Sequence, residues 1–152
     1  MAATSSFRFF GARKGRPGEP LNEVCACCGA HLAVRVVFLR NTEGVVRPFG
    51  VDCAARAMGI PAPGRKEKAV DAFIFAANME RISGLPQGTP DDATERIPSA
   101  RGLLPFAVLP GGVIRVHRTG MVTDEAVNAF TAQGHTVTWA FASGTRIWLQ
   151  LA

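Results

Sequence analysis

No apolar run in the chain is long enough to span a bilayer. The longest apolar stretch, residues 69–79, is interrupted by Asp71 and Asn78 and is far shorter than the roughly 20 residues that a membrane helix requires. A hydrophobic fraction of 47% over 152 residues is also too high for a disordered chain. The sequence therefore predicts a soluble protein with one ordinary domain, or with two small units that share a core.

Cysteine is absent after residue 53, and this distribution argues against a secreted disulfide scaffold. Such scaffolds spread their cysteines along the chain, whereas Cys25, Cys27, Cys28 and Cys53 could link only one short loop. A reducing compartment fits this pattern better. We therefore expect a cytoplasmic protein without a membrane partner.

Acidic side chains are absent from residues 1–18, and the net charge of +5 is unevenly distributed. Lys and Arg outnumber Asp and Glu by 11 to 5 in residues 1–68, a balance of +6. Residues 69–102 contain 3 basic and 5 acidic side chains, a net charge of −2, and the residues from 103 onward contain 3 and 2, a net charge of +1. The basicity therefore lies with the cysteines, where it favours phosphate backbones or acidic protein surfaces as partners, or serves solubility alone.

Motifs of the common enzyme classes are also missing. The chain contains no phosphate-binding G-x-x-x-x-G-K-[ST] loop, no nucleophile elbow and no H-E-x-x-H. His117 and His135 fall in predicted strands with no nearby Asp, Glu or Cys partner, so we interpret them as ordinary surface or edge residues. We predict no catalytic residue and a protein that is not an enzyme.

The pattern of the N-terminal third predicts a β-hairpin followed by a short helix. Residues 32–38 (LAVRVVF) and 44–49 (GVVRPF) are rich in β-branched side chains and flank a turn-like stretch. Residues 51–58 (VDCAARAM) contain helix-forming alanines and an early Asp, and Gly59 supplies a stop signal.

The rest of the chain predicts a helix, a linker and a β-α-β-β unit. Residues 66–82 place apolar side chains at helical spacing, and residues 85–102 are polar and rich in Pro and Gly, as in a long surface connection. The last unit comprises a strand over residues 113–118, a helix from the N-cap Thr123 to about Gln133, and strands over residues 135–142 and 145–151. Trp139 and Trp148 are interpreted as core residues rather than as a base-stacking platform.

The cysteine spacing predicts a metal site. Cys25 and Cys28 have the C-x-x-C spacing with which a tight turn directs two thiolates at one metal, and Gly29 completes that turn. Cys53 falls in the first turn of the predicted short helix, whose dipole stabilises a thiolate. Cysteines buried as small hydrophobic residues, or a redox-active C-x-x-C pair, are less consistent with this spacing.

This order of knuckle, hairpin and ligand-bearing helix resembles treble-clef-like zinc-binding modules common in bacterial and phage proteins. The resemblance covers about residues 22–60, with a C-x-x-C-G knuckle and a later G-x-x-C at residues 50–53. It implies a structural Zn²⁺. In the usual treble clef the helix supplies two ligands at C-x-x-C spacing, and here Gly50 stands at the first of these positions. A fourth ligand must therefore come from elsewhere.

His31 is our first choice for that fourth ligand, because a hairpin that begins there could fold its imidazole toward the metal. Cys27 is the second choice, although its side chain would tend to point away if Cys25 and Cys28 face the metal. Asp52, an exogenous ligand or a water are the remaining alternatives, and a water would leave the open position that catalytic zinc uses.

Basic side chains around this module suggest a surface for DNA or RNA. Residues 1–20 are expected to form a flexible basic arm in which Phe7, Phe9 and Phe10 alternate with cations; alternatively, these phenylalanines anchor the arm as a strand. The candidate nucleic-acid contacts are Arg8, Arg13, Lys14, Arg16, Arg35, Arg40, Arg47, Arg65, Lys66 and Lys68.

These expectations together describe an α+β protein. It has the arm over residues 1–20, a treble-clef-like zinc module over 21–60, a helix and polar linker over 61–102, and the β-α-β-β unit over 103–152. Our leading hypothesis is a zinc-stabilised protein that binds nucleic acid. A protein-interaction or self-assembly module with a purely structural zinc site is the alternative, and an enzyme that uses a thiolate such as Cys27 is the third.

Overall fold

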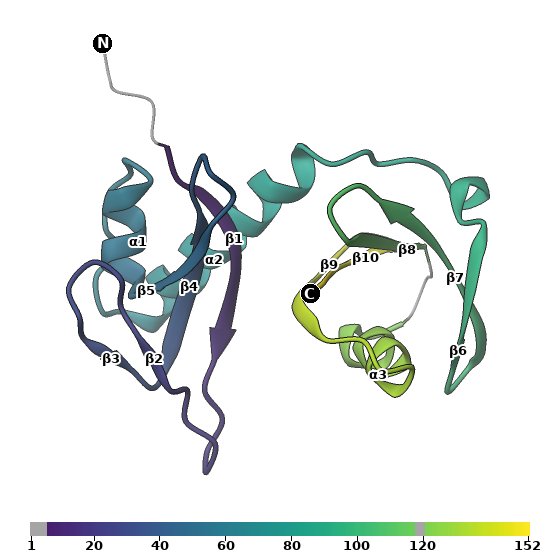
Figure 1. The fold of residues 1–152 in the computed structure, drawn as a ribbon, viewed down its shortest axis with the longest axis horizontal. Coiled ribbons are helices and arrows are strands. Elements are labelled where there is room, and N and C mark those ends of the chain that lie inside the picture. The colour runs from purple at the N-terminus through teal and green to yellow at the C-terminus, as the bar shows by residue number, and fades with distance from the viewer. Residues whose placement is uncertain (1–5, 118–120) are drawn as a thin grey trace. The chain divides into compact units, whose positions relative to one another are not determined.

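The computed structural model describes residues 6–117 and 121–152, and the chain forms two compact units, Met1–Arg81 and Ile82–Ala152. The described residues contain three α-helices and three antiparallel β-sheets (Figure 1). This mixture agrees with the α+β class that the sequence predicts.

The N-terminal unit is built on a three-stranded antiparallel sheet. In spatial order its strands are β1 (Arg8–Lys14), β4 (Arg35–Arg40) and β5 (Val46–Phe49). β4 and β5 form the predicted hairpin. Its turn is held by Asn41, whose Oδ1 accepts the N–H groups of Glu43 and Val45 at 2.9 Å each. Gly44 completes the turn with a φ of 83°, which strongly favours glycine.

Strand β1 arises from the segment expected to be a flexible arm, of which residues 1–5 lie outside the described residues. It pairs with β4 and has an irregularity between Phe9 and Gly11. The Phe7 ring packs edge-on against Phe49 with 5.6 Å between centroids, and Phe9 packs against the buried core. The phenylalanines thus anchor the segment as a strand, which is the alternative that the sequence left open.

Two short strands and two helices complete the N-terminal unit. They are β2 (Glu23–Val24), β3 (His31–Leu32), α1 (Val51–Ala57) and α2 (Glu67–Ser83), whose last two residues belong to the second unit. Helix α1 begins after Gly50, and Gly59, with a φ of 74°, follows its C-cap as the sequence predicts.

The core of this unit joins the sheet, α1 and the first cysteine. Its buried members are Cys25, Val37, Leu39, Phe49 and Ala54. Because Ala54 follows Cys53 directly, burial of the helix face at Ala54 fixes the helix turn that carries Cys53. The packing of the sheet against α1 therefore positions one of the predicted metal ligands.

The C-terminal unit is a five-stranded antiparallel sheet with one helix. Its strands, in spatial order, are β6 (Glu95–Ser99), β7 (Gly102–Leu109), β8 (Val113–His117), β10 (Arg146–Leu151) and β9 (Val137–Ser143), and its helix is α3 (Thr123–Ala132). The predicted β-α-β-β order of residues 113–151 is confirmed. Thr123 is the first helical residue rather than the N-cap, and Arg118, expected to end β8, lies outside the described residues.

The expected polar connection over residues 85–102 is wrong in its second half, where the chain forms β6. Only Ile97 of this strand is fully buried, and Pro98 interrupts the alternation, so the segment carries little strand signal. An edge strand tolerates such a proline because one side of its backbone has no neighbour to bond. A short 3-10 turn, η1 (Pro90–Asp92), precedes β6.

Helix α3 covers one face of the C-terminal sheet. Phe130 of this helix packs against Phe106 of β7 with 5.0 Å between ring centroids, and it lies in a buried cluster with Ile147 and Leu149. Trp148 alternates with those two residues and so lies on the opposite face, in a second cluster with Trp139. The two tryptophans are 0% and 4% exposed, which confirms their interpretation as core residues.

Candidate metal centre and basic surface

A tight turn between β2 and β3 carries the first two predicted metal ligands. The N–H of Cys25 donates to Ala30 O at 2.9 Å, and the N–H of Gly29 donates to Cys25 O at 2.9 Å. Gly29 has a φ of 74°, so the turn strongly favours glycine at this position. The N–H of Ala26 donates to Pro48 O at 2.8 Å and ties the turn to β5.

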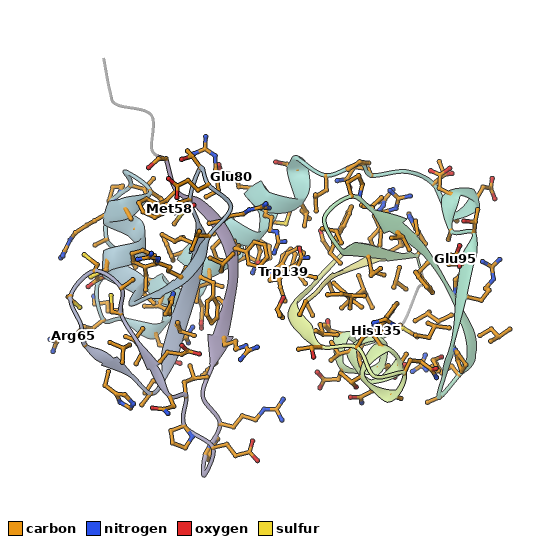
Figure 2. All side chains as sticks on the ribbon, in the orientation of Figure 1. Met58, Arg65, Glu80, Glu95, His135 and Trp139 are labelled. Atoms are coloured by element: carbon orange, nitrogen blue, oxygen red, sulfur yellow. The ribbon has the colours of Figure 1, made fainter. Side chains whose placement is uncertain are left out.

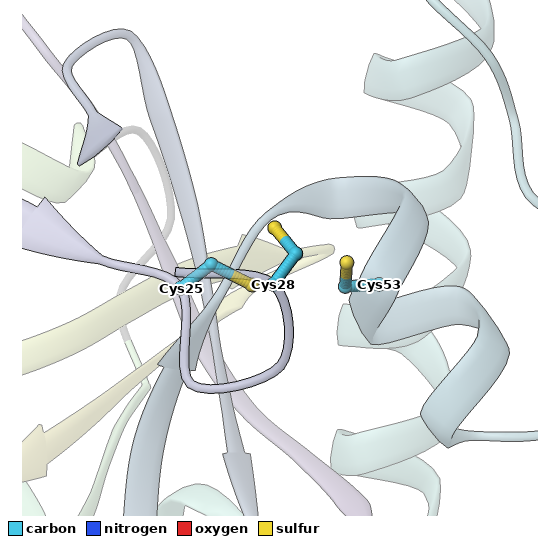
Figure 3. Close-up of side chains that lie close together, drawn as sticks. All are labelled: Cys25, Cys28 and Cys53. Atoms are coloured by element: carbon cyan, nitrogen blue, oxygen red, sulfur yellow. The ribbon is translucent and has the colours of Figure 1, made fainter. Parts of the chain in front are cut away.

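The start of α1 is joined directly to this turn. The N–H of Gly50 donates to the sulfur of Cys25 at 3.3 Å. Gly50, which stands where the usual treble clef has a ligand, therefore contacts the site through its backbone instead of through a side chain. Cys53 follows in the first turn of α1 and points its sulfur toward the same region (Figure 3).

Cys25, Cys28 and Cys53 form a compact group of sulfur atoms. All three Sγ atoms lie within 4.8 Å of one another (Figure 3). Thiolates around a tetrahedral zinc, with Zn–S bonds of about 2.3 Å, stand about 3.8 Å apart. Small side-chain adjustments would therefore bring the group to bonding distance, and these three cysteines can hold a metal ion.

The ionisation of the group also fits a bound cation. Burial raises the pKa of Cys25, but the N–H donors of Cys28, Gly50 and Cys27 outweigh it, and the pKa falls to about 7. Burial and hydrogen bonds with the Cys25 and Cys28 thiols raise the pKa of Cys53 to about 12. A divalent cation would allow the thiols to ionise together, because it offsets the repulsion between the thiolates.

The other predicted ligands occupy different places. His31 is exposed, and its Nε2 lies 3.2 Å from Asn22 Oδ1, so it is not part of the sulfur group. Asp52 accepts the N–H of Gly64 at 3.2 Å. Cys27 is exposed and is not part of the sulfur group.

The predicted nucleic-acid contacts lie on the sheet, on the turn after it and around the start of α2. The sheet carries five of them: Arg8, Arg13 and Lys14 on β1, Arg40 on β4 and Arg47 on β5. The turn after β1 carries Arg16, which pairs through its backbone with Glu19. The region where α2 begins carries Arg65, Lys66 and Lys68. All nine are exposed. Arg65 lies at the edge of the N-terminal unit (Figure 2).

Arg35 is the exception among these ten residues. Its side chain is 13% exposed and forms ion pairs with Glu67 at 2.8 Å and Asp71 at 2.7 Å. Burial lowers the pKa of Arg35, but the two carboxylates outweigh it and raise the pKa overall. This arginine joins β4 to α2 and is not presented to a polyanion.

Like charges face each other across the sheet of the N-terminal unit. Arg8 lies directly opposite Arg40, and Lys14 lies directly opposite Arg35. Counting by unit, residues 1–81 hold 12 Lys or Arg and 7 Asp or Glu, a balance of +5, whereas residues 82–152 hold 5 of each. The whole net charge of the protein therefore lies in the unit that carries the cysteines.

The interpretation of His117 as a surface or edge residue is wrong. His117 is 9% exposed, on a strand inside the sheet, and its Nε2 accepts the Arg115 Nε–H at 2.9 Å. Arg115 is 2% exposed and also donates to Pro86 O at 2.6 Å. Sequence reasoning missed this network because an arginine and a histidine two residues apart resemble a solvent-facing stripe. His135, by contrast, is exposed as expected.

Among the described residues, no helix combines the length and apolar character needed to cross a membrane. Comparisons of the chain with models of known protein families, with curated proteins and with solved structures find no match.

Proposed function

We propose that the chain is a zinc-stabilised protein that binds nucleic acid through its N-terminal unit. The observation that carries this proposal is the set of exposed cations on the sheet next to the cysteine group, including the directly opposed Arg8 and Arg40. Like charges opposite each other destabilise a sheet. A polyanion that neutralises them would remove this cost.

Zinc is the metal that suits the cysteine group best. Soft thiolate ligands select Zn²⁺, Cu⁺ or iron–sulfur clusters, and a knuckle that shares a structural site with a helix is typical of zinc. The chain order of knuckle, β4–β5 hairpin and α1 supports a treble-clef-like module. The buried core of this module is small, and modules with so small a core gain much of their stability from a bound metal.

The metal and the basic surface would act together. The knuckle bonds to β5 through Ala26 and to the start of α1 through the Cys25 sulfur, so a metal held by the cysteines would stiffen the sheet that presents Arg40 and Arg47. Preorganised cations bind phosphates with less loss of conformational entropy. Arg35 is excluded from this surface because it is mostly buried and paired with Glu67 and Asp71, whereas Lys14, which also pairs with Glu67 at 3.2 Å, stays exposed.

The test is fluorescence anisotropy with labelled single-stranded DNA, duplex DNA and single-stranded RNA at several salt concentrations. We expect affinity for at least one of them to fall linearly on a log–log plot as salt rises, because binding releases counterions. The double variant Arg40→Gln/Arg47→Gln should weaken binding and lower the salt slope by about 1 for each charge removed.

A matched control removes two charges from the other unit. Arg96→Gln/Arg101→Gln changes the net charge equally, but both residues lie in the C-terminal unit. This variant should leave affinity and salt slope near those of the wild type. Absence of binding to all three probes at low salt, or equal losses in the two double variants, would refute the proposal.

A second candidate function, self-assembly or protein binding through a sheet edge, is favoured by β9. This strand ends the C-terminal sheet and contains no proline and no charged residue, whereas the opposite edge strand, β6, has Pro98, Glu95 and Arg96. Uncharged edges are templates for strand pairing. Light scattering after size exclusion should then give a mass above 16.2 kDa for the wild-type protein. The edge variant Ala142→Lys should give the mass of the monomer. A monomeric wild-type protein at high concentration would exclude self-assembly.

A further inference from the structure

A pocket of about 330 Å³ lies in the N-terminal unit, where β4, α1 and α2 begin. Its volume falls in the range of about 300–1,000 Å³ that is usual for small-molecule sites. Val34, Val51 and Val70 supply its apolar lining, and charged side chains supply most of the rest. The pocket therefore offers apolar contact together with polar groups that can fix the orientation of a ligand.

Two of the charged side chains in the pocket neutralise each other. Arg35 pairs with Glu67 at 2.8 Å, and the same carboxylate oxygen of Glu67 accepts Lys14 at 3.2 Å. Arg35 also pairs with Asp71 at 2.7 Å. These contacts make Arg35 and Glu67 part of the wall of the pocket, so neither is the first choice for holding a ligand.

The other two charged side chains, Asp52 and Arg65, keep their binding capacity. Among the residues that the structure describes, neither has an ion-pair partner. Asp52 accepts the Gly64 N–H through Oδ1 at 3.2 Å, which leaves Oδ2 for another donor. The Arg65 guanidinium is exposed and has no hydrogen-bond acceptor in the same described part of the chain. A ligand of this pocket should thus offer donors to a carboxylate and acceptors to a guanidinium.

Guanine has both sets of groups on the edges of one flat ring system. Its O6 and N7 atoms accept two N–H groups of an arginine, and its N1–H and N2–H₂ groups match the two oxygens of a carboxylate. Adenine and cytosine have an amino group but no ring N–H beside it. Thymine and uracil have one ring N–H between two carbonyl oxygens, which a carboxylate repels. The valine side chains can contact the faces of the ring.

We propose that this pocket binds an unpaired guanine of a single-stranded nucleic acid, held by Asp52 at N1–H and N2–H₂ and by Arg65 at O6 and N7. This inference rests on the proposed function and adds a base preference to it. In a duplex the Watson–Crick edge of guanine is already paired, so the pocket requires a single strand. Lys66 and Lys68, both exposed around the start of α2, can contact the flanking phosphates.

The test is fluorescence anisotropy of the full-length chain with labelled thymine oligonucleotides that differ at one central base, and with the equivalent uracil series in RNA. A central guanine should bind about five- to a hundredfold more tightly than any other base, because a bidentate contact discriminates by that much. Equal affinities within both series would overturn the inference but not the proposed function. No binding to either series would overturn the inference, and no binding to duplex DNA as well would overturn the proposed function.

Asp52→Asn separates the guanine contact from general electrostatics. Asparagine keeps an oxygen for the Gly64 N–H but presents an amide donor to the donors of guanine, so the preference for guanine should disappear. Affinity for the all-thymine oligonucleotide should stay equal or rise, because a negative charge is lost. The control Glu43→Gln removes the same charge from the β4–β5 turn, outside the pocket, and should keep the preference. A preference that survives Asp52→Asn would overturn the inference.

Two further measurements distinguish other roles of the pocket. Asp52 precedes Cys53, so the zinc content of Asp52→Asn is measured with its affinity; it should equal that of the wild type, whereas loss of zinc would assign Asp52 to the metal and overturn the inference. Guanosine monophosphate should bind much more weakly than the guanine oligonucleotide, because it has no flanking phosphates. Equal affinity would make a free nucleotide the ligand and overturn the assignment to a strand.

Discussion

A single methyl group at Gly88 should disrupt the C-terminal unit. Its φ is 57°, and a Cβ placed there would lie 2.1 Å from the Nη2 atom of Arg115. Arg115 is buried under this segment, where it donates to Pro86 O and to His117 Nε2. Gly88→Ala therefore strains the backbone and displaces a buried guanidinium from its acceptors.

The expected loss in the free energy of unfolding has two parts. A left-handed backbone costs alanine about 1–2 kcal/mol, of which the lower entropy of the unfolded chain offsets roughly half. Each hydrogen bond from a charged donor contributes about 1.5–3 kcal/mol, and the displacement weakens two of them. With partial relaxation of the exposed segment, we expect Gly88→Ala to destabilise this unit by about 3–5 kcal/mol.

Gly111→Ala is the matched control. Gly111 also has a left-handed φ, 81°, but a Cβ there would meet nothing within 4 Å. It should cost only the backbone part, about 0.5–1 kcal/mol. In an Arg115→Met background the additional penalty of Gly88→Ala should disappear, because the atoms that it displaces are absent.

Urea unfolding followed by tryptophan fluorescence is the appropriate assay. Both tryptophans of the chain, Trp139 and Trp148, are buried in the C-terminal unit, so the signal reports on this unit. The midpoint should fall without a change in slope. Equal midpoints for Gly88→Ala and Gly111→Ala would refute the argument that the Arg115 contact determines the cost.

Two further predictions concern the metal and the pH. Elemental analysis of Cys53→Ser should find less than one zinc per chain. Circular dichroism should show a lower thermal stability of its N-terminal unit, because metal-binding energy contributes to folding. Full zinc content in this variant would contradict the site. Burial, together with the charges of Arg115 and Arg146, lowers the pKa of His117 in the folded protein. The His117 ring therefore binds a proton more readily in the unfolded chain than in the folded one. Stability of the C-terminal unit should be complete above about pH 6.5 and decrease below it. Urea midpoints measured above and below this pH should no longer depend on pH in His117→Gln, whereas those of His135→Gln should still fall at low pH.

Local signals in the sequence predicted several elements correctly. Gly59 ends α1, and the β-branched runs around Asn41 form the β4–β5 hairpin, because capping and turn chemistry act between residues close in the chain. The C-x-x-C spacing likewise placed Cys25 and Cys28 in one turn, and the closeness of Cys53 followed from the predicted order of hairpin and helix.

Other features depended on neighbours that are distant in sequence. β1 is a strand because β4 supplies its hydrogen-bond partners, and Phe7 finds a partner in Phe49 that no local pattern reveals. β6 exists because β7 pairs with it, in spite of Pro98. A strand is stabilised by pairing with a neighbouring strand, so its own residues need not show a strong β-strand pattern in the sequence.

The candidate site shows the same division. By itself the sequence determined which thiols can meet, because a knuckle and a helix start are local geometries. The basicity of residues 1–68 was equally plain from composition. Only the tertiary structure decided which cations are exposed. It paired Arg35 with Glu67 and Asp71 and buried Arg115 beneath the segment of Gly88, because the partners of these side chains come from elements far away in the chain.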